Sequence, residues 1–353
     1  MDTYREYVGN THVHSVYSDG EATYQQVATA AAEAKLNFVI VTDHNVRPEG
    51  LEGYRGQTLV LSGEEVHNVR RQPSANHLLV YGLEQDIAPY SFGSTQTLVQ
   101  AVRRQDGVCY IAHPIERSSP IAPELAAIPW TTWPPDNIHG IELWNYMSEF
   151  KGLLWSKAVA PIFAFLPELG IRGPYRATLR LWDELLSQGY RIAAIGGADA
   201  HGKTYKMGPL QRQIFPYEYL FRCVNTHILT KSSLTGDTDE DKVLIYEALR
   251  AGRTWVGYDL PHSTRGFRCL AQSGSASAVP GEELQRLGAI TITITLPAKG
   301  EIHLRRDGKT IRRTVGRSLK YTSVEAGIYR VEVYRRFRGH RVGWIFTSPI
   351  YAI

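Results

Sequence analysis

Six of the 12 histidines in this 353-residue chain stand in short polar clusters, and most of these clusters follow an apolar run. Imidazole nitrogen and carboxylate oxygen are the donors that zinc, manganese and iron accept in proteins. Clusters that follow strand-like runs are expected to meet at one rim of the fold. The pattern therefore predicts a polynuclear metal site. Its candidate residues are His12, His14, Asp19, Asp43, His44, Glu64, Glu65, His77, His113, Asp199 and His201.

Two histidine-containing pairs have the spacing of neighbours on one face of a strand. His12 and His14 are two residues apart within an expected strand at 7–14, so both side chains should point the same way. Asp199 and His201 should do the same if the preceding strand continues through them. Each pair can offer two ligands to one cation or to adjacent cations.

A carboxylate between two cations would offset their repulsion. Glu64 and Glu65 follow the apolar run 59–61, and the residues alone leave the choice between them open. Five other histidines lack acidic companions in such a motif and are expected to be held by hydrogen bonds: His139, His227, His262, His303 and His340. His67 lies close to the Glu pair but has no motif, so it is unassigned.

Apolar runs alternate with amphipathic segments through the first 260 residues. Helices are expected at 21–35, 94–105, 176–188 and about 239–252. This alternation predicts an α/β fold of parallel strands with helical crossovers. A closed or distorted (β/α) barrel suits the motifs better than an open sheet, because they must converge from strands far apart in sequence.

Two other regions differ from this pattern. Residues 116–137 are rich in Pro and Trp and predict a long loop near His113. After about residue 260, short alternating strands predict a small antiparallel β domain, so the expected domains are 1–260 and 261–353. Residues 306–309 form a hairpin signal, Arg-Asp-Gly-Lys.

The charge distribution and the cysteines bear on the binding partners and the cellular compartment to be expected. The net charge is +4, but residues 299–341 carry a surplus of nine positive charges and the remainder carries about −5. An acidic partner or nucleic acid is possible for this region, although solvated Arg side chains that protect strand edges are the favoured interpretation. The three cysteines form no paired motif, no apolar stretch has membrane-spanning length, and no signal peptide is evident, so we expect a cytoplasmic protein.

The ordered motifs resemble those of the PHP (polymerase and histidinol phosphatase) superfamily over about residues 7–260. They are His12-Val13-His14, Ser18-Asp19-Gly20, Thr42-Asp43-His44-Asn45, Gly63-Glu64-Glu65, His113-Pro114 and Asp199-Ala200-His201. Residues 141–145 (Ile-Glu-Leu-Trp-Asn), 251–254 and the C-terminal β domain are similar to the CehA/McbA-like branch, which is named after carbaryl hydrolases. The resemblance implies a distorted (β/α)7 barrel that holds two or three divalent ions (Zn, Mn or Fe).

The resemblance also implies three ligand groups. His12, His14, Glu65 and Asp199 would hold the first metal. Glu65 would bridge to a second metal completed by His77 and His113, and the family spacing Gly-x-Glu favours Glu65 over Glu64. Asp19, His44 and His201 would hold a third. Glu65 and Asp199 would thereby be catalytic.

Four further residues are candidates for roles around the metals. Asp43 would orient a ligand or accept a proton, or else stabilise the turn at the end of its strand. Arg117, Asn145 and Lys203 follow the motifs closely enough to meet an anionic substrate. Arg117 and Lys203 would otherwise be ordinary solvated side chains.

Three classes of function remain open from the sequence. The first is a metal-dependent phosphoesterase that acts on a small phosphate ester or nucleotide, with a metal-activated water as nucleophile. The second is a carbamate, ester or amide hydrolase, in which Trp130, Trp133 and Trp144 would shape an apolar pocket. The third is a metal-stabilised binding module without catalysis. A nuclease would require the basic tail to lie beside the metals.

Overall fold

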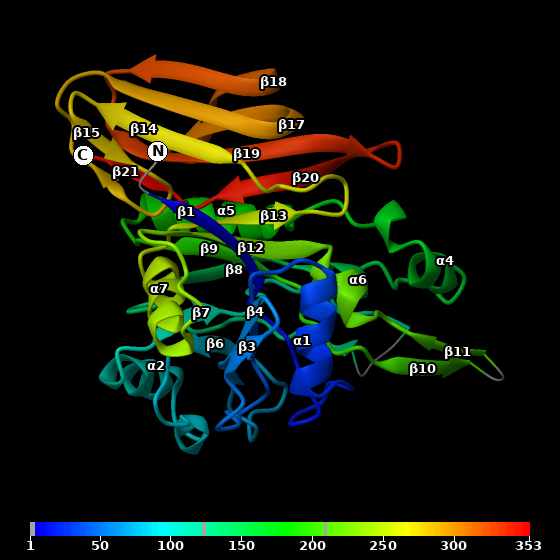
Figure 1. Cartoon of the computed structure of the whole chain (residues 1–353). Helices are drawn as coiled ribbons and strands as arrows, with labels where there is room; N and C mark the ends of the chain where they lie inside the picture. Colours follow the sequence, from blue (N-terminus) through cyan, green and yellow to red (C-terminus); the bar gives the residue numbers. More distant parts are fainter. Residues whose placement is uncertain (1–3, 122–124, 208–209) are drawn as a thin grey trace.

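The computed structural model describes residues 4–121, 125–207 and 210–353. In Figure 1, a mixed α/β part, coloured blue to yellow-green, lies below a layer of long strands coloured yellow to red. A mixed α/β fold followed by mainly antiparallel strands was expected from the sequence and is confirmed.

The first sheet of the α/β part is built around the N-terminal strand. In it β1 (Arg5–Asn10), β2 (Phe38–Val41) and β4 (Thr58–Ser62) are parallel, and β3 (Gly53–Arg55) forms a hairpin with β4. On the other side of β1, the strands β12 (Val224–Thr230) and β13 (Thr254–Tyr258) add in antiparallel orientation. The expectation of parallel strands throughout is therefore wrong for β12.

The second sheet has five strands in chain order: β5 (Glu64–Val66), β6 (Leu78–Tyr81), β7 (Val108–Ile111), β8 (Gly140–Asn145) and β9 (Ala193–Gly197). β7, β8 and β9 are parallel, whereas β6 is antiparallel to both neighbours. An antiparallel return needs no helical crossover, and no helix separates β5 from β6. The reversal has a consequence for the site, because His77 directly precedes β6. Only this orientation brings His77 to the rim where β7, β8 and β9 end.

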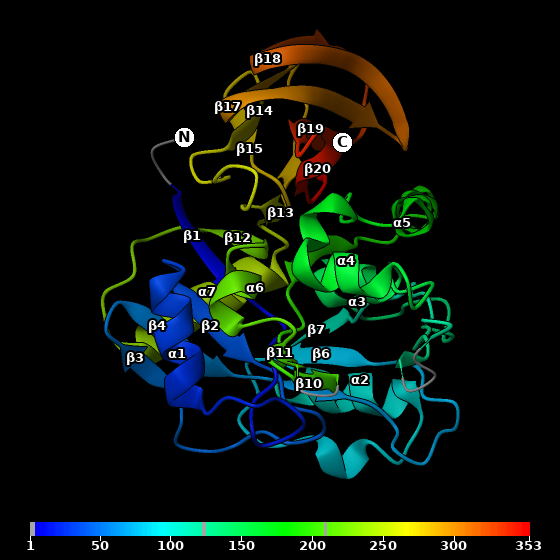
Figure 2. The same cartoon turned by 90° about the vertical axis from the view of Figure 1, so that its right-hand side faces the viewer.

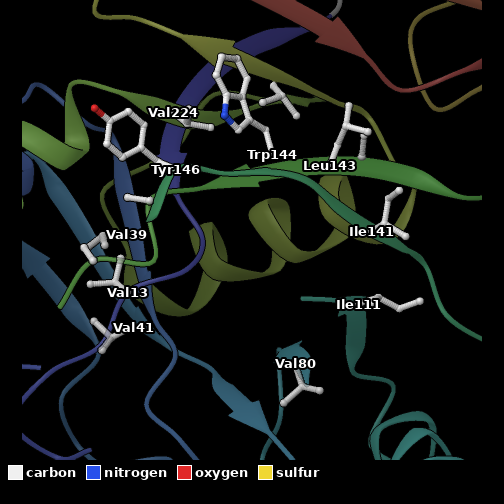
Figure 3. Packing of buried hydrophobic residues seen from close by; sticks show 14 of the residues in the cluster. Val13, Val39, Val41, Val80, Ile111, Ile141, Leu143, Trp144, Tyr146 and Val224 are labelled. Atoms are coloured by element: carbon white, nitrogen blue, oxygen red, sulfur yellow. The ribbon is translucent and has the colours of Figure 1, made fainter. Parts of the chain in front are cut away.

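The hydrogen bonds divide these strands into two sheets, so the expected (β/α)7 barrel is not confirmed as one closed ladder. Two isolated parallel bridges, Val13 to Ala200 and His44 to Glu65, join segments at the rim. Side chains from both sheets share one buried core, in which Figure 3 labels Val39 and Val41 of β2, Val80 of β6 and Ile111 of β7. This core holds the strand ends at fixed positions.

The helices lie close to their expected positions. They are α1 (Tyr24–Glu33), α2 (Thr95–Arg104), α5 (Arg176–Ser187) and α7 (Thr238–Arg250), with shorter helices α3 (Tyr146–Lys151), α4 (Ala160–Phe165) and α6 (Tyr217–Phe221). α1 begins at the N-cap Thr23, which forms a capping box with Gln26. α1 packs on β2 and β4, α2 on β7, and α7 on β12.

Loops and short elements complete this part. Single 3-10 turns lie at Ala88–Tyr90 and Pro167–Leu169, and β10 (Thr204–Met207) pairs with β11 (Leu210–Gln213). The described residues of 116–137 form no strand or α-helix, which confirms the predicted loop. Among the described residues, no helix has both the length and the apolar character needed to cross a membrane.

The C-terminal strands build a second layer with its own core. They are β14 (Arg268–Ser273), β15 (Ala276–Ala278), β16 (Glu283–Leu284), β17 (Ile290–Arg306), β18 (Lys309–Ser323), β19 (Gly327–Phe337), β20 (His340–Thr347) and β21 (Ile350–Ala352). Figure 2 shows β17 and β18 curving above the rest of the chain. Asp307 and Gly308 form the predicted turn between them, with φ of 48° and 74°. β13 pairs with β20, so this layer continues the first sheet.

Much of the basic charge of this layer is neutralised within the chain. Arg305 and Arg330 form ion pairs with Asp183, and Arg313 and Arg341 form ion pairs with Glu301. Among the strands of the described residues, β18 pairs only with β17, and its side chains are largely exposed. These contacts agree with Arg side chains that protect a strand edge.

Candidate metal centre

Glu65 lies at the middle of the clustered histidines. Its buried carboxylate has five histidine nitrogens within 3.2 Å. Oε2 faces His12 Nε2, His14 Nε2 and His44 Nδ1 at 3.1, 3.2 and 3.2 Å, whereas Oε1 faces His77 Nδ1 and His113 Nε2 at 2.7 and 3.0 Å. The two oxygens thus face two different sets of histidines, which is the arrangement that a carboxylate bridging two cations requires.

Glu64 points away from this cluster, because successive side chains of a strand lie on opposite faces. Its Oε1 accepts a hydrogen bond from the backbone N–H of Ile87 at 3.2 Å. Burial and the nearby Asp86 raise the pKa of Glu64 to about 8. The geometry therefore places Glu65, and not Glu64, among the histidines.

Asp199 completes the first of several groups whose ligand atoms lie within 4.8 Å of one another. Its Oδ1 is 3.3 Å from His12 Nε2 and 3.2 Å from His14 Nε2. The groups are His12, His14, Glu65, Asp199; Glu65, His77, His113; His14, Asp19, His44, His201; and His44, His67, His77. The first three contain the residues that the family resemblance implies, with His14 added to the third. The fourth includes His67, which the sequence left unassigned.

Several of these ligand residues lie beyond the ends of the strands that were expected to carry them. β1 ends at Asn10, so His12 and His14 lie beyond it, where the bridge of Val13 to Ala200 holds the segment. β9 ends before Asp199, whose φ of 55° is uncommon for a residue with a side chain. The shared face of Asp199 and His201 depended on the strand continuing through them, and it does not, because a left-handed residue breaks the alternation.

The third group opens toward solvent. Asp19 Oδ1 is 3.1 Å from His201 Nε2, and Asp19 Oδ2 accepts a hydrogen bond from Lys203 Nζ at 2.8 Å. The side chains of Asp19 and Lys203 are both 40% exposed, in contrast to the buried Glu65. Lys203 therefore lies at the rim of the cluster, where it is accessible to a ligand.

Two histidines have an outer nitrogen that faces an acceptor. His12 Nδ1–H donates to Glu142 at 2.9 Å, and His201 Nδ1–H donates to the carbonyl of Asp199 at 2.8 Å. His77 Nε2 lies 3.0 Å from the Ser74 hydroxyl, which can donate or accept. With the proton held on Nδ1, the Nε2 lone pair of His12 and of His201 would be available to a metal ion. His14 Nε2 and His44 Nδ1 are buried and have no hydrogen-bond partner among the described residues. This donor set fits divalent transition-metal ions.

The charges of the cluster shift one another's pKa values strongly. Burial lowers the pKa of His14, but Asp199 and Glu65 outweigh burial and raise it to about 9. Burial raises the pKa of Glu65, but His12, His44 and His77 hold it well below its ordinary value. The carboxylates therefore stay ionised and stabilise positive charge at this point of the fold.

Glu142 is a functional candidate that sequence reasoning did not single out. It lies on β8 and is buried, with Oε1 accepting from His12 Nδ1 and Oε2 accepting from the backbone N–H of His113 at 3.0 Å. It orients residues of the first and second groups at once. A signal was present in the sequence, because a carboxylate stood within the apolar strand 138–144.

Asn145 is a buried substrate candidate that touches the cluster directly. Its Nδ2 donates to Glu142 at 2.9 Å and to Asp199 Oδ2 at 3.2 Å. Its Oδ1 accepts from the backbone N–H of Ser148 and caps α3. Asn145 therefore positions two carboxylates of the site.

Asp43 does not contact the clustered side chains with its carboxylate. It accepts hydrogen bonds from Ser15 N–H, Ser15 Oγ and Ser18 Oγ at 2.7, 2.6 and 2.6 Å. These bonds hold the loop that follows His14 and carries Asp19. The geometry agrees with the turn-stabilising role that was one of the two predictions for Asp43.

Arg117 and Trp144 lie apart from the cluster. The exposed guanidinium of Arg117 stacks over the Tyr175 ring at 4.6 Å. Trp144 is buried in the core and donates from Nε1 to Glu149 at 2.8 Å, so it does not shape an apolar substrate pocket. Regular alternation would put Trp144 on the same face as Glu142, but the pairing of β8 with β9 is irregular between these two residues, so the alternation is broken there.

The sequence matches no protein-family model and no curated protein. Among solved structures, this chain is similar to a two-domain protein from Bacteroides vulgatus ATCC 8482, which is described as containing a predicted PHP-like metal-dependent phosphoesterase. The two are 16% identical with a TM-score of 0.48, and the match covers 99% of this chain and 96% of that one. A candidate metal-dependent phosphoesterase from Bifidobacterium adolescentis ATCC 15703 is 14% identical with a TM-score of 0.35, covering 57% and 90%. An amidohydrolase from Chromobacterium violaceum is 13% identical with a TM-score of 0.27, covering 66% and 99%. Each of these TM-scores is below 0.5, so these likenesses carry no argument about the function of this chain.

Proposed function

We propose that this chain is a hydrolase of the PHP type that uses two or three divalent metal ions to cleave a phosphoester. The observation that carries the proposal is the Glu65 carboxylate, whose two oxygens face two separate sets of histidine nitrogens. Residues 1–260 would form the catalytic part, and residues 261–353 would be an accessory β domain of the CehA/McbA-like branch.

The chain supplies ligands and holds them in place. Bound divalent ions would supply Lewis acidity and a water activated near neutral pH. Glu142 fixes the tautomer of His12, and Asn145 holds Glu142 and Asp199 in position. Asp43 orders the loop that carries Asp19. No covalent nucleophile is proposed, since burial raises the pKa of Cys109 and of Cys269 to about 12.

The charge balance supports an anionic substrate. The carboxylates within the first three ligand groups are those of Asp19, Glu65 and Asp199. Three divalent cations would outweigh these charges, even with that of Glu142 added, and leave a positive site that attracts a phosphate group. Lys203 at the rim adds a further positive charge.

A carbamate, ester or amide hydrolase remains the second candidate, with one observation in its favour. Trp130 donates its backbone N–H to the carbonyl of Pro114, next to His113, and its ring lies edge-on to the 39% exposed Trp133. These two rings would offer an aromatic surface beside the centre. The buried position of Trp144 weakens this alternative.

The test is a substrate panel on manganese- and zinc-loaded protein. Phosphomonoesters, phosphodiesters, aryl carbamates and aryl esters would be compared between the wild type and a His12→Ala, His14→Ala double variant. We expect phosphoester turnover that the double variant lacks. Turnover of carbamates alone would favour the second candidate. Stable metal binding without any turnover would favour a binding module and contradict the proposal.

A further inference from the structure

We infer that His67 is a substrate-positioning residue that donates a hydrogen bond to an anionic oxygen of the substrate. This inference rests on the proposed function and adds a residue that none of the three implied ligand groups contains. A ring nitrogen of His67 lies within 4.8 Å of ligand atoms of both His44 and His77. His67 therefore stands between the second and third groups.

The neighbours of His67 fix its ring. It stacks on His77 with centroids 4.1 Å apart and an angle of 11°, and it meets His44 edge-on at 5.2 Å. Asn45 holds both its backbone and its ring: Oδ1 accepts from His67 N–H at 3.1 Å, and Nδ2 lies 3.3 Å from His67 Nδ1. The Asn45 backbone N–H donates to the carbonyl of Glu65 at 3.1 Å, so this support is tied to the centre.

The contact with Asn45 decides which proton His67 carries. Because Asn45 Oδ1 is engaged by a backbone N–H, its Nδ2 must face His67 Nδ1 and donate to it. A neutral imidazole whose Nδ1 accepts carries its proton on Nε2. His12 and His201 show the opposite arrangement, in which Nδ1–H donates to an oxygen acceptor and Nε2 faces the carboxylates of the cluster. By distance His67 would qualify as a ligand, but its hydrogen bonding makes it a donor to an anion.

His67 is partly exposed, as His44 and His201 of the third group are, whereas His12, His14 and His77 are buried. A substrate oxygen can therefore reach its N–H from solvent. A phosphate group has enough oxygens to accept a hydrogen bond from this donor and also to meet divalent ions that the ligand groups would hold.

The experiment compares His67→Ala and His67→Gln with the wild type, and uses His340→Ala as a control that removes an exposed histidine of the distant β20 strand. Binding of inorganic phosphate to zinc-loaded protein would be measured by calorimetry, and zinc content by elemental analysis. We expect His67→Ala to bind phosphate about tenfold more weakly at unchanged zinc content. His67→Gln keeps an N–H donor and should recover most of this loss, and His340→Ala should match the wild type.

Each other outcome would overturn the inference. Equal phosphate affinity in wild type and His67→Ala would remove the donor role, while phosphoester turnover by both would leave the proposed function intact. A zinc ion lost in His67→Ala would make His67 a ligand instead. Absence of phosphate binding by the wild type would contradict the inference, and absence of turnover on the whole panel would contradict the proposed function separately.

Discussion

The chain buries histidine beside carboxylates at two places, and the hydrogen bonds of the two clusters differ. At the metal centre, five histidine nitrogens crowd around the two oxygens of Glu65, and His14 Nε2 has no hydrogen-bond partner among the described residues. At the second place, His227 is equally buried but has both nitrogens engaged. Its Nδ1 lies 3.0 Å from Glu6 Oε1, and its Nε2 lies 2.6 Å from Thr264 Oγ1.

The second cluster is complete without any added ion. Thr264 Oγ1–H donates to Asp259 at 2.7 Å, so the Thr264 hydroxyl is free to accept from His227 Nε2–H. His227 also stacks on Trp255 with centroids 4.9 Å apart. The comparison teaches that burial and acidic neighbours alone do not identify a metal ligand. Unpaired nitrogens that face a shared carboxylate, as in His14 and His44, are what make the first cluster a candidate metal centre.

The largest difference between the two clusters should appear when Glu65 is replaced. We expect Glu65→Ala to lower phosphoester turnover by about 10³-fold or more, because several kcal/mol of metal-dependent stabilisation would be lost. Removal of metal with a chelator should have the same effect and be reversed by manganese or zinc. Retention of wild-type turnover after either treatment would contradict the proposal that Glu65 holds metal ions needed for catalysis.

The next effect should come from Glu142, which supports the metal centre without being in its ligand groups. Glu142→Gln should weaken zinc binding about 10- to 100-fold, because the hydrogen bond that fixes the His12 tautomer is altered. Glu64→Gln is the matched control, since Glu64 is buried on β5 but faces away. Competition with a chromophoric chelator measures both affinities, and equal affinities for the two variants would remove the role of Glu142.

At the second cluster the expected effect is on stability. His227→Ala should lower the free energy of unfolding by roughly 3 kcal/mol, because buried groups of Glu6 and Thr264 lose their partner. Turnover per folded molecule should stay within about threefold of the wild type, because the His227 ring contacts no residue of the metal centre in the described structure. Urea denaturation and the phosphoester assay measure these quantities. A large loss of turnover with unchanged stability would contradict this assignment.

The pH dependence of that stability sharpens the same contrast. Burial lowers the pKa of His227, but Asp259 and Glu6 outweigh burial and raise it. The stabilisation that His227 contributes is therefore fully present below about pH 6.5. It is lost as the pH rises through the raised pKa of His227 in the folded state. The pKa of Asp259 is lowered to about 2 although burial raises it, so its contribution is lost only in acid. The difference in unfolding free energy between wild type and His227→Ala should shrink from pH 6 to pH 9, and a difference that grows would contradict the assignment.

The smallest effects should separate the two exposed cations near the metal centre. Lys203→Ala should raise KM about threefold, because an exposed charge at the rim contributes little energy. Arg117→Ala should leave KM unchanged, since its guanidinium stacks on Tyr175 away from the cluster. Steady-state kinetics measures both, and a larger effect for Arg117 would show that its side chain reaches the substrate.

Much of the candidate site could be predicted from residue types and order. His12, His14, Asp19, His44, Glu65, His77, His113, Asp199 and His201 were all named from motifs, and the structure brings all of them together. The helices α1, α2, α5 and α7 follow local periodicity and capping, which is why their bounds were close. Whether these residues bind metal stays a prediction.

Other features depended on contacts that a sequence does not display. The roles of Glu142 and Asn145 arise because β8 lies between β7 and β9 and directs these side chains toward His12 and Asp199. The reversal of β6 and the positive φ of Asp199 could not be predicted from alternation alone. The burial of Trp144 likewise depends on the face of β8 that meets the core.

The sequence by itself determined which donor atoms are present and in what order, because residue types and local propensities are encoded along the chain. Only the tertiary structure decided which nitrogen of each histidine faces inward, which glutamate enters the cluster and which histidine is complete without an ion. Those choices depend on hydrogen bonds between segments that lie as far as 221 residues apart, and such bonds exist only once the sheets have packed together.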